Sequence, residues 1–401
     1  MRRICLTVVG LYLMFLQGFS QGIRKDTTGY QSKKLKLEEV NLVSSYYTQT
    51  GDHSAIRGGI GPENVTDLAN GLELKWVGVD AHQRKSTLTA DMGIDYHTAA
   101  SQAWISQTGA SRHTDGLRLY PSLDWTRENE KKGSSFSLGA YYSSEFNYKS
   151  LGVNAGITRK TKNNGEFGLK VSGYFDQVKM ILPSEFEPAG AGSGGIGNHH
   201  PDYPSSPRQT YTSSFSFSQV INTRVQVAFL LDLVEQHGYL GLPFHRVFFT
   251  DGTDLVEKLP SSRFKLPVGF RLNYFLGDRI VLRTYYRYYF DSWGMRSHTA
   301  NLEVPVKITP FFSISPFYRY YEQSAVRYFA PYEQHLKTEG YYSSNYSLSS
   351  FSSRFFGAGI RLARPDGILK THLAVLELRY GHYTQTTDLV ASIISLNLGF
   401  K

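Results

Sequence analysis

Long stretches in which apolar and polar side chains alternate are the feature that most constrains the fold of this chain. The clearest is residues 263–276, RFKLPVGFRLNYFL, where apolar side chains fill the even positions and Arg, Lys and Asn stand at odd positions. Residues 279–290 and 301–308 repeat the pattern. Because successive side chains of a strand point to opposite faces, each stretch is predicted to form a β-strand with one apolar and one polar face.

Sixteen strands are predicted in this way: 38–49, 71–80, 86–97, 114–127, 134–145, 149–160, 165–178, 209–221, 223–236, 262–276, 279–291, 298–308, 311–323, 353–364, 371–383 and 388–401. Strands of soluble proteins average about 5–6 residues, whereas a strand that crosses a membrane at a tilt needs about 9–11. The predicted lengths therefore favour a membrane barrel. A soluble β-sandwich or propeller is the alternative, but the chain shows no repeat of about 40–50 residues.

The connections between these strands alternate in length. Short connections are expected at 81–85, 128–133, 161–164, 222, 277–278, 309–310 and 365–370, and long ones at 50–70, 98–113, 179–208, 237–261 and 324–352. The connections at 146–148, 292–297 and 384–387 are short although they fall on the long side. We therefore expect an all-β fold, a transmembrane antiparallel β-barrel of the outer membrane with about 16 strands (14–18), short periplasmic turns and long extracellular loops.

The N-terminus has the pattern of an export signal. Arg2 and Arg3 form a basic start, residues 4–16 form a short apolar segment, and residues 18–20 supply small side chains for cleavage. Cys5 would leave with the signal, which excludes a disulfide scaffold and a cysteine-based metal site. The predicted organisation is a signal peptide over 1–20, a short periplasmic segment over 21–37 and a single barrel over 38–401.

The composition agrees with a barrel of this kind. A hydrophobic content of 41% is too high for a disordered chain. Aromatic residues make up 14% of the chain and cluster at strand ends, for example at 46–47, 285–290 and 318–321. Such clusters are typical of the two girdles at the membrane interfaces. The last strand resembles the C-terminal assembly signal of outer-membrane barrels, although Lys401 follows the aromatic Phe400.

Several segments resemble an exported family catalogued as domain of unknown function 3570, which is typical of the Bacteroidota and their Gram-negative relatives. The resemblance is carried by residues 44–54 (SSYYTQTGDHS), 242–247 (LPFHRV), 256–260 (VEKLP), 262–265 (SRFK) and 299–312 (TANLEVPVKITPFF). It covers essentially the whole chain after the signal and implies the outer membrane of a Gram-negative bacterium. It supplies no substrate, catalytic residue or cofactor.

The polar faces of the strands carry the best functional signal. An apolar set on lipid leaves the polar set facing the lumen, because a charge at the membrane midplane costs about 2–4 kcal/mol. The predicted basic wall consists of Lys265, Arg271, Arg279, Arg283, Arg287, Lys307 and Arg319. The acidic residues predicted to face the same lumen are Asp91, Asp95, Asp124, Asp176, Asp232, Glu303 and Glu377. Two interpretations stay open: a pore that favours anions, or a packed lumen in which these charges pair.

Two loops contain candidate contact residues. His245 and Arg246 lie in an apolar frame within the loop 237–261, and Asp52 and His53 begin the loop 50–70. These residues would form a plug tip or a docking site, or they belong to a packed loop with a hydrogen-bonded histidine.

Other chemistries are less well supported. His199, His200 and Asp202 have metal-ligand side chains, but adjacent histidines seldom share one ion, so we expect no metal site. Residues 190–197 match the G-x-G-x-x-G pattern in a loop without a following helix, which indicates a flexible loop. Neither a G-x-S-x-G nor an H-E-x-x-H motif occurs. The arginines have lumen spacing rather than the clustering of a nucleic-acid patch.

The leading hypothesis is therefore a porin-like passage for small, anionic solutes, without enzymatic activity or cofactors. The first alternative is an occluded barrel that anchors or docks a periplasmic or surface protein. The second is an integral outer-membrane hydrolase. In each case we expect contacts with outer-membrane lipids and lipopolysaccharide, and with the barrel assembly machinery during biogenesis, but no binding of nucleic acid.

Overall fold

The structure is a computed structural model that describes residues 32–98, 116–145, 147–182 and 204–401. The chain divides into two units, Met1–Ser32 and Lys33–Lys401, and every element described here belongs to the second. The predicted signal peptide, residues 1–20, lies outside the described residues and stays a prediction.

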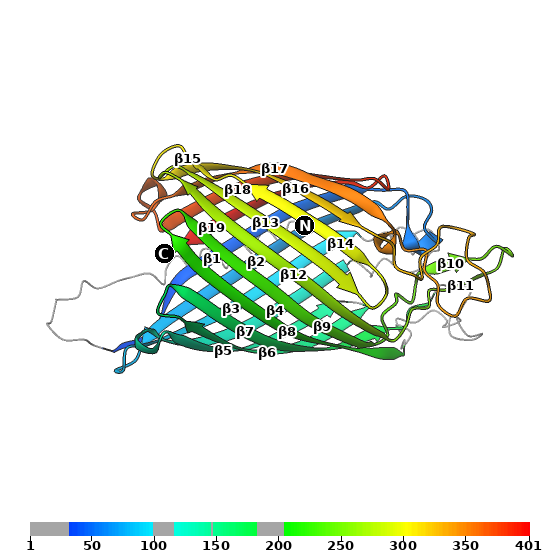
Figure 1. Cartoon of the computed structure of the whole chain (residues 1–401), viewed down its shortest axis with the longest axis horizontal. Helices are drawn as coiled ribbons and strands as arrows, with labels where there is room; N and C mark the ends of the chain where they lie inside the picture. The colour runs from blue at the N-terminus through cyan, green and yellow to red at the C-terminus, as the bar shows by residue number, and fades with distance from the viewer. Residues whose placement is uncertain (1–31, 99–115, 146, 183–203) are drawn as a thin grey trace, which may run out of the picture. The chain divides into compact units, whose positions relative to one another are not determined.

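The second unit is a closed antiparallel β-barrel (Figure 1). Its wall strands are β1 (Lys33–Thr50), β2 (Val65–Val79), β3 (Arg84–Thr98), β4 (Gly116–Asn129), β5 (Ser134–Glu145), β6 (Tyr148–Lys160), β7 (Gly165–Lys179), β8 (Ser205–Asn222), β9 (Val225–Gly238), β12 (Ser262–Leu276), β13 (Ile280–Asp291), β14 (Arg296–Glu303), β15 (Val306–Lys307), β16 (Phe312–Gln323), β17 (Phe351–Ala363), β18 (Leu373–Gln385) and β19 (Val390–Phe400). The first and last strands, β1 and β19, pair and close the ring. The predicted all-β barrel is thereby confirmed.

The strands β14 and β15 share one position in the wall, because both pair with β13 and β16, so the ring has sixteen positions. The sequence predicted one strand over 298–308. The break falls at Pro305, which has no N–H to donate to a neighbouring strand. Its carbonyl still accepts from the Val281 amide at 3.1 Å, so the chain stays in the wall.

Two strands begin five or more residues earlier than predicted. β1 starts at Lys33 instead of residue 38, so the end of the expected periplasmic segment belongs to the wall. β2 starts at Val65 instead of residue 71 and pairs there with the end of β1. Near the start of β2, the polar residues Thr66 and Asn70 stand on the outer face, which weakens the apolar alternation that marks a strand.

The pairing register assigns the apolar side chains to the outer face. Phe229, Val268 and Tyr286 all stand there, and Phe229 is 54% exposed. On the opposite face, the Arg379 guanidinium reaches Glu303 at 3.1 Å across the intervening strands β16 and β17. Side chains on strands that far apart converge only on a concave surface. The charged face therefore lines the lumen, and the apolar face is suited to lipid.

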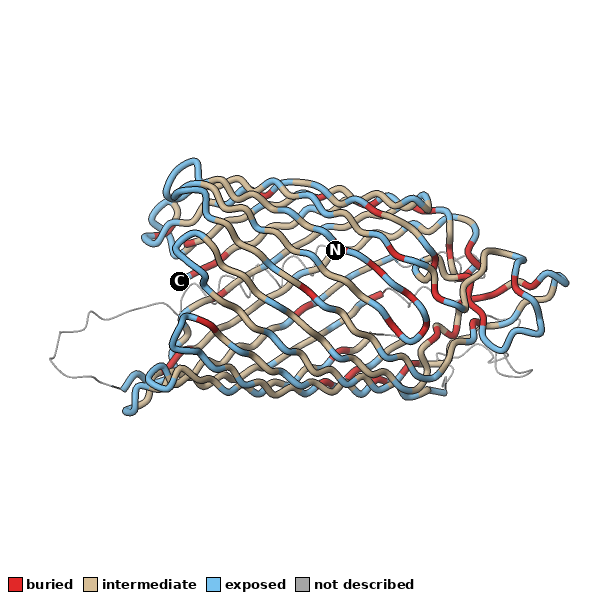
Figure 2. The backbone as a smooth tube through the Cα atoms, viewed as in Figure 1, coloured by how far each residue is buried: buried red, intermediate tan, exposed pale blue. Residues whose placement is uncertain are grey.

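The long connections 51–64, 239–261 and 324–350 pack together at one end of the barrel, and we call them the cap (Figure 2). The second contains the hairpin of β10 (Arg246–Phe248) and β11 (Asp254–Val256). Its core is formed by Val247 and Phe249 against Tyr342 of the third. Within the described residues, no helix combines the length and apolar character required to cross a membrane.

Candidate functional site: the charged lumen

Four arginines of the predicted basic wall lie on the lumenal face: Arg271, Arg283, Arg287 and Arg319, which we call the wall arginines. The strands β12, β13 and β16 hold them, and the odd numbering of all four follows from the two-residue repeat of a strand. The Arg271 guanidinium lies 5.4 Å from the ring centre of Tyr285, and the Arg319 guanidinium lies 5.8 Å from the ring centre of Phe355.

The other three basic residues occupy different positions. Arg279 lies in the turn before β13, and Lys307 ends the two-residue strand β15, so both stand at the rim with the short turns. Their backbones are joined, since the Lys307 amide donates to the Arg279 carbonyl at 2.8 Å. Lys265 lies in register with Asp291, which Arg263 contacts. The middle of the wall thus depends on the four wall arginines.

The predicted acidic residues face the lumen, but among the described residues none forms an ion pair with a wall arginine. Asp91, Asp95 and Asp124 lie on β3 and β4 and contact neutral partners, such as the Tyr120 hydroxyl at 2.6 Å from Asp95. Glu73 on β2 accepts from the Asn41 amide at 2.6 Å. We call Glu73, Asp91, Asp95 and Asp124 the acidic sector. It lies on strands separate from the wall arginines.

The remaining acidic residues have local partners. Asp176 pairs with Arg208 at 2.9 Å. Glu303 and Glu377 both contact Arg379, at 3.1 and 3.7 Å. Asp232 lies in register with Ser214.

None of the four wall arginines forms an ion pair with a residue in the described part of the chain. The packed-lumen interpretation requires such pairs. Among the described residues, Arg283 alone of the four has an acidic neighbour in register, Glu303, and that carboxylate contacts Arg379 instead.

The loop candidates belong to the interior of the cap. Arg246 is 7% exposed and donates from Nη1 to the Ile56 carbonyl at 2.9 Å. His245 is 8% exposed, and burial lowers its pKa to about 3, so the ring is neutral. Their burial fits the packed-loop alternative, because an outside partner cannot reach these two side chains in this packing.

His53 is also part of the cap. Its ring stacks on Tyr346 at 3.6 Å, and its Nδ1 lies 3.0 Å from the Gly59 carbonyl oxygen. Asp52 next to it is exposed and is the one of the four loop candidates that remains open to solvent.

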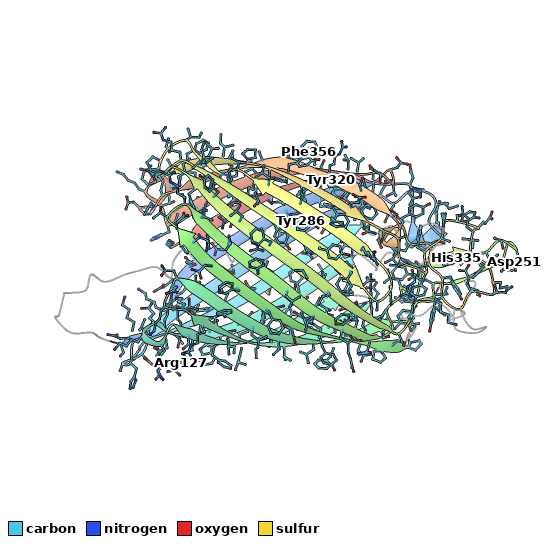
Figure 3. The ribbon with its side chains drawn as sticks, viewed as in Figure 1. Arg127, Asp251, Tyr286, Tyr320, His335 and Phe356 are labelled. Carbon is cyan, nitrogen blue, oxygen red and sulfur yellow. The ribbon has the colours of Figure 1, made fainter. Side chains whose placement is uncertain are left out.

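Figure 3 shows where the residues that it labels lie along the barrel. His335 and Asp251 lie at the cap end, whereas Arg127 lies at the opposite end, near the short turns. Tyr286, Tyr320 and Phe356 stand on the wall between them, on the outer face by register. The candidate metal ligands His199, His200 and Asp202 lie outside the described residues, in which no group of three potential ligands occurs.

These features define a class of protein: a closed antiparallel barrel of sixteen wall positions, with an apolar outer surface and a charged lumen. The chain belongs to the family described as "Protein of unknown function (DUF3570)", whose model matches residues 76–388. The resemblance seen in the sequence is thereby confirmed. No curated protein matches the chain.

The barrel is also similar to solved structures from Pseudomonas aeruginosa. OpdQ has 9% sequence identity and a TM-score of 0.40, covering 90% of this chain and 98% of that chain. The outer membrane protein OpdK has 8% identity and a TM-score of 0.40 over 90% and 98%. OccK9 (OpdG) has 9% identity and a TM-score of 0.42 over 90% and 97%. The fold assignment rests on the strand topology described above and not on these likenesses.

Proposed function

We propose that this protein is an outer-membrane barrel of a Gram-negative bacterium that provides a passage for small anionic solutes. The observation that carries the proposal is the set of four wall arginines without ion-pair partners among the described residues. A ring of sixteen strands is wide enough for an aqueous channel. Fixed positive charges along such a channel raise the local concentration of anions and so favour their diffusion.

The size of the effect follows from Coulomb's law. A unit charge about 8 Å from an ion in water-like surroundings changes its free energy by roughly 0.5 kcal/mol, or about twofold in local concentration. Two wall arginines acting together therefore contribute at least about fourfold to the preference for anions.

Planar-bilayer recording of the refolded protein under a salt gradient tests this proposal. The double variant Arg271→Ala, Arg283→Ala should lower the anion-to-cation permeability ratio at least about fourfold. The matched control, Arg279→Ala with Lys307→Ala, removes the same charge at the rim and should have a smaller effect. An unchanged ratio in the wall variant would contradict the proposal.

The packed cap favours a second candidate, the occluded barrel that docks another protein. Three connections are joined there by buried contacts such as Arg246 to Ile56. This candidate predicts a silent bilayer from protein whose barrel is folded, together with a partner that binds the exposed surface of the cap.

The hydrolase alternative has weaker support. On the outer face, the Ser392 Oγ lies 3.1 Å from the Nδ1 of His382. A triad needs a third group that orients the other ring nitrogen. Among the described residues, no carboxylate or amide contact to that nitrogen is found, so we propose no catalytic role for this pair.

A further inference from the structure

A cavity of about 540 Å³ lies within the lumen, beside the cap. We call it the loop-end pocket, and its lining is Tyr47, Gln49, Arg287, Thr299, Arg319, Tyr321, Ser353, Phe355, Tyr383, Gln385, Leu389, Ala391 and Ile393. The strand residues among these belong to the lumenal face by register, as in the row that joins Arg287, Thr299 and Tyr321. The pocket therefore opens to the path that a solute would take.

One side of the pocket is built for an anion. Arg287 and Arg319 stand on β13 and β16, the two strands that flank β14. Arg287 is in register with Thr299 of β14, and Arg319 is in register with Asn301, two residues further along the same strand. The Arg287 Nε is buried and has no hydrogen-bond partner. Thr299 lies between them, is only 5% exposed, and its Oγ1 is likewise buried without a partner. Both donor atoms are closed off from the pocket in this packing, so a ligand accepts from them only after the two side chains turn toward it. Buried donors that lack partners are costly, which favours that change when an anion enters.

The rest of the lining is largely aromatic, and its tyrosine hydroxyls already have hydrogen-bond partners. Three strands carry the same Tyr-x-Gln arrangement, in which each tyrosine hydroxyl donates to the glutamine two residues later. The distances are 2.7 Å for Tyr47 to Gln49, 2.6 Å for Tyr321 to Gln323 and 2.8 Å for Tyr383 to Gln385. The phenol protons are thereby used, and the rings offer mainly their apolar surfaces.

The glutamines in turn are held by the connections that follow their strands. The Gln49 amide donates to the Glu63 carbonyl at 3.3 Å, and the Gln323 amide to the carbonyls of Ser347 and Ser349 at 3.0 and 2.6 Å. The Gln385 amide donates to the Thr387 hydroxyl at 2.6 Å. These bonds fix the three rings before any ligand enters, which lowers the entropic cost of binding.

We propose that the loop-end pocket binds a small aromatic monocarboxylate. The inference deepens the proposed function, since it names a solute class for the same lumen. The carboxylate accepts from Arg287, Thr299 and Arg319, and the ring lies among the tyrosines, Phe355 and Ile393. A sugar acid fits less well, because its hydroxyls need polar partners that the tyrosines and glutamines already give to one another.

Isothermal titration of the refolded full chain in detergent micelles tests the proposal without requiring a conducting channel. Benzoate is the probe, and acetate and gluconate at equal ionic strength are the comparison ligands. We expect saturable binding of benzoate, with at least about tenfold weaker binding of both comparison ligands. Gluconate binding as tightly as benzoate would overturn the aromatic assignment, and absence of saturable benzoate binding would overturn the site.

The variants Arg287→Gln and Arg319→Gln should each weaken benzoate binding at least about tenfold, since each removes a charged donor. The variant Tyr321→Leu, which keeps an apolar side chain but removes the ring, should also weaken it. Arg279→Gln, at the rim with the short turns and outside both the pocket and the wall arginines, is the matched control and should leave binding unchanged. Strand content measured by circular dichroism verifies folding of each variant.

The two proposals fail separately. A silent bilayer with benzoate binding that depends on Arg287 overturns the passage and supports the pocket. Anion-selective conductance with benzoate affinity that is equal in the wild type, Arg287→Gln and Arg319→Gln overturns the pocket and supports the passage.

Discussion

At the scale of single residues, the most unusual environment is that of Glu257 in the cap. Glu257 is only 4% exposed. Its carboxyl group accepts hydrogen bonds from the Ser343 Oγ at 2.5 Å and from the Leu242 amide at 2.9 Å, and it lies 3.8 Å from Nδ1 of His245. Burial raises the pKa of this carboxyl despite the two hydrogen bonds. Since His245 is neutral, no cation beside it offsets the cost of ionising Glu257.

The raised pKa of Glu257 makes the stability of the cap depend on pH. At low pH the Glu257 carboxyl is protonated in the folded and the unfolded cap and has no effect. As pH rises above the ordinary glutamate pKa toward the raised folded value, the unfolded state ionises first, so the cap loses stability. Each unit by which the pKa is raised corresponds to about 1.4 kcal/mol.

Glu257→Gln should therefore stabilise the cap at pH 8 and leave it nearly unchanged at pH 4, because glutamine keeps the acceptor for Ser343 and cannot ionise. Hydrogen exchange of the Val247 and Phe249 amides, corrected for the intrinsic rate at each pH, measures this. Glu339→Gln is a control of opposite sign, since contact with His335 holds the pKa of Glu339 below its usual value. Equal loss of protection in Glu257→Gln at both pH values would contradict the argument.

At the scale of elements, the inner face of β16–β18 is shaped by glycines. Gly359 leaves room for Arg379, which lies 4.9 Å from the centre of the Phe317 ring on its way to Glu303. Gly357 and Gly381 leave room for the rings of Phe317 and Phe355. A Cβ atom at Gly357 would come within 2.0 Å of the Tyr380 carbonyl oxygen, and one at Gly381 within 2.5 Å of the Phe355 ring.

Gly357→Ala should accordingly lower the free energy of unfolding by about 1–3 kcal/mol, the usual cost of forcing atoms into a packed site. Urea unfolding of the refolded protein in lipid vesicles measures it. Gly71→Ala is the matched control, because it faces the same lumen from β2 and has no atom within 4 Å of the added Cβ. Similar midpoints for both variants would mean that the glycines are not required for this packing.

The sequence predicted these elements well for a physical reason. Alternation depends only on each residue and its position in the strand, so it revealed the lumenal side of Arg271, Arg283, Arg287 and Arg319 without knowledge of the pairing. It did not reveal the break at Pro305 or the early start of β2, because the alternation is uninterrupted at the first and weak at the second.

Which side chains contact one another was harder to predict than which face of the sheet each side chain occupies. The contact of Arg379 with Glu303 depends on a register that spans four strands, and the contact of Arg246 with Ile56 joins residues 190 positions apart. Loops have no periodicity that would report such contacts. The pattern Tyr-x-Gln occurs four times in the sequence, but only the fold shows that the three copies on β1, β16 and β18 place their tyrosines around one pocket.

At the scale of the whole molecule, the lumen has a basic side on β12, β13 and β16 and an acidic sector on β2, β3 and β4. Charges of this kind act on a passing ion through water, where salt screens them over about 10 Å at 0.1 M and about 3 Å at 1 M.

The anion preference should therefore fall steeply between 0.1 M and 1 M potassium chloride, and reversal potentials at equal gradients across this range measure it. Wild-type protein and the Arg279→Ala, Lys307→Ala control should show the same decline. A preference that does not change with salt would instead indicate selection by close contact at a constriction.

The pairing of β1 with β19 has a consequence for timing. Val40 is opposite Phe400 and Thr50 is opposite Val390, so the seam of the ring joins segments from the two ends of the barrel sequence. Every other pair of neighbours in the wall can form as soon as two successive strands exist, but this pair has to wait for the last one. A chain that lacked β19 would leave a sheet with two open edges, and such edges recruit other chains. Closure of the ring therefore depends on the last wall strand being present.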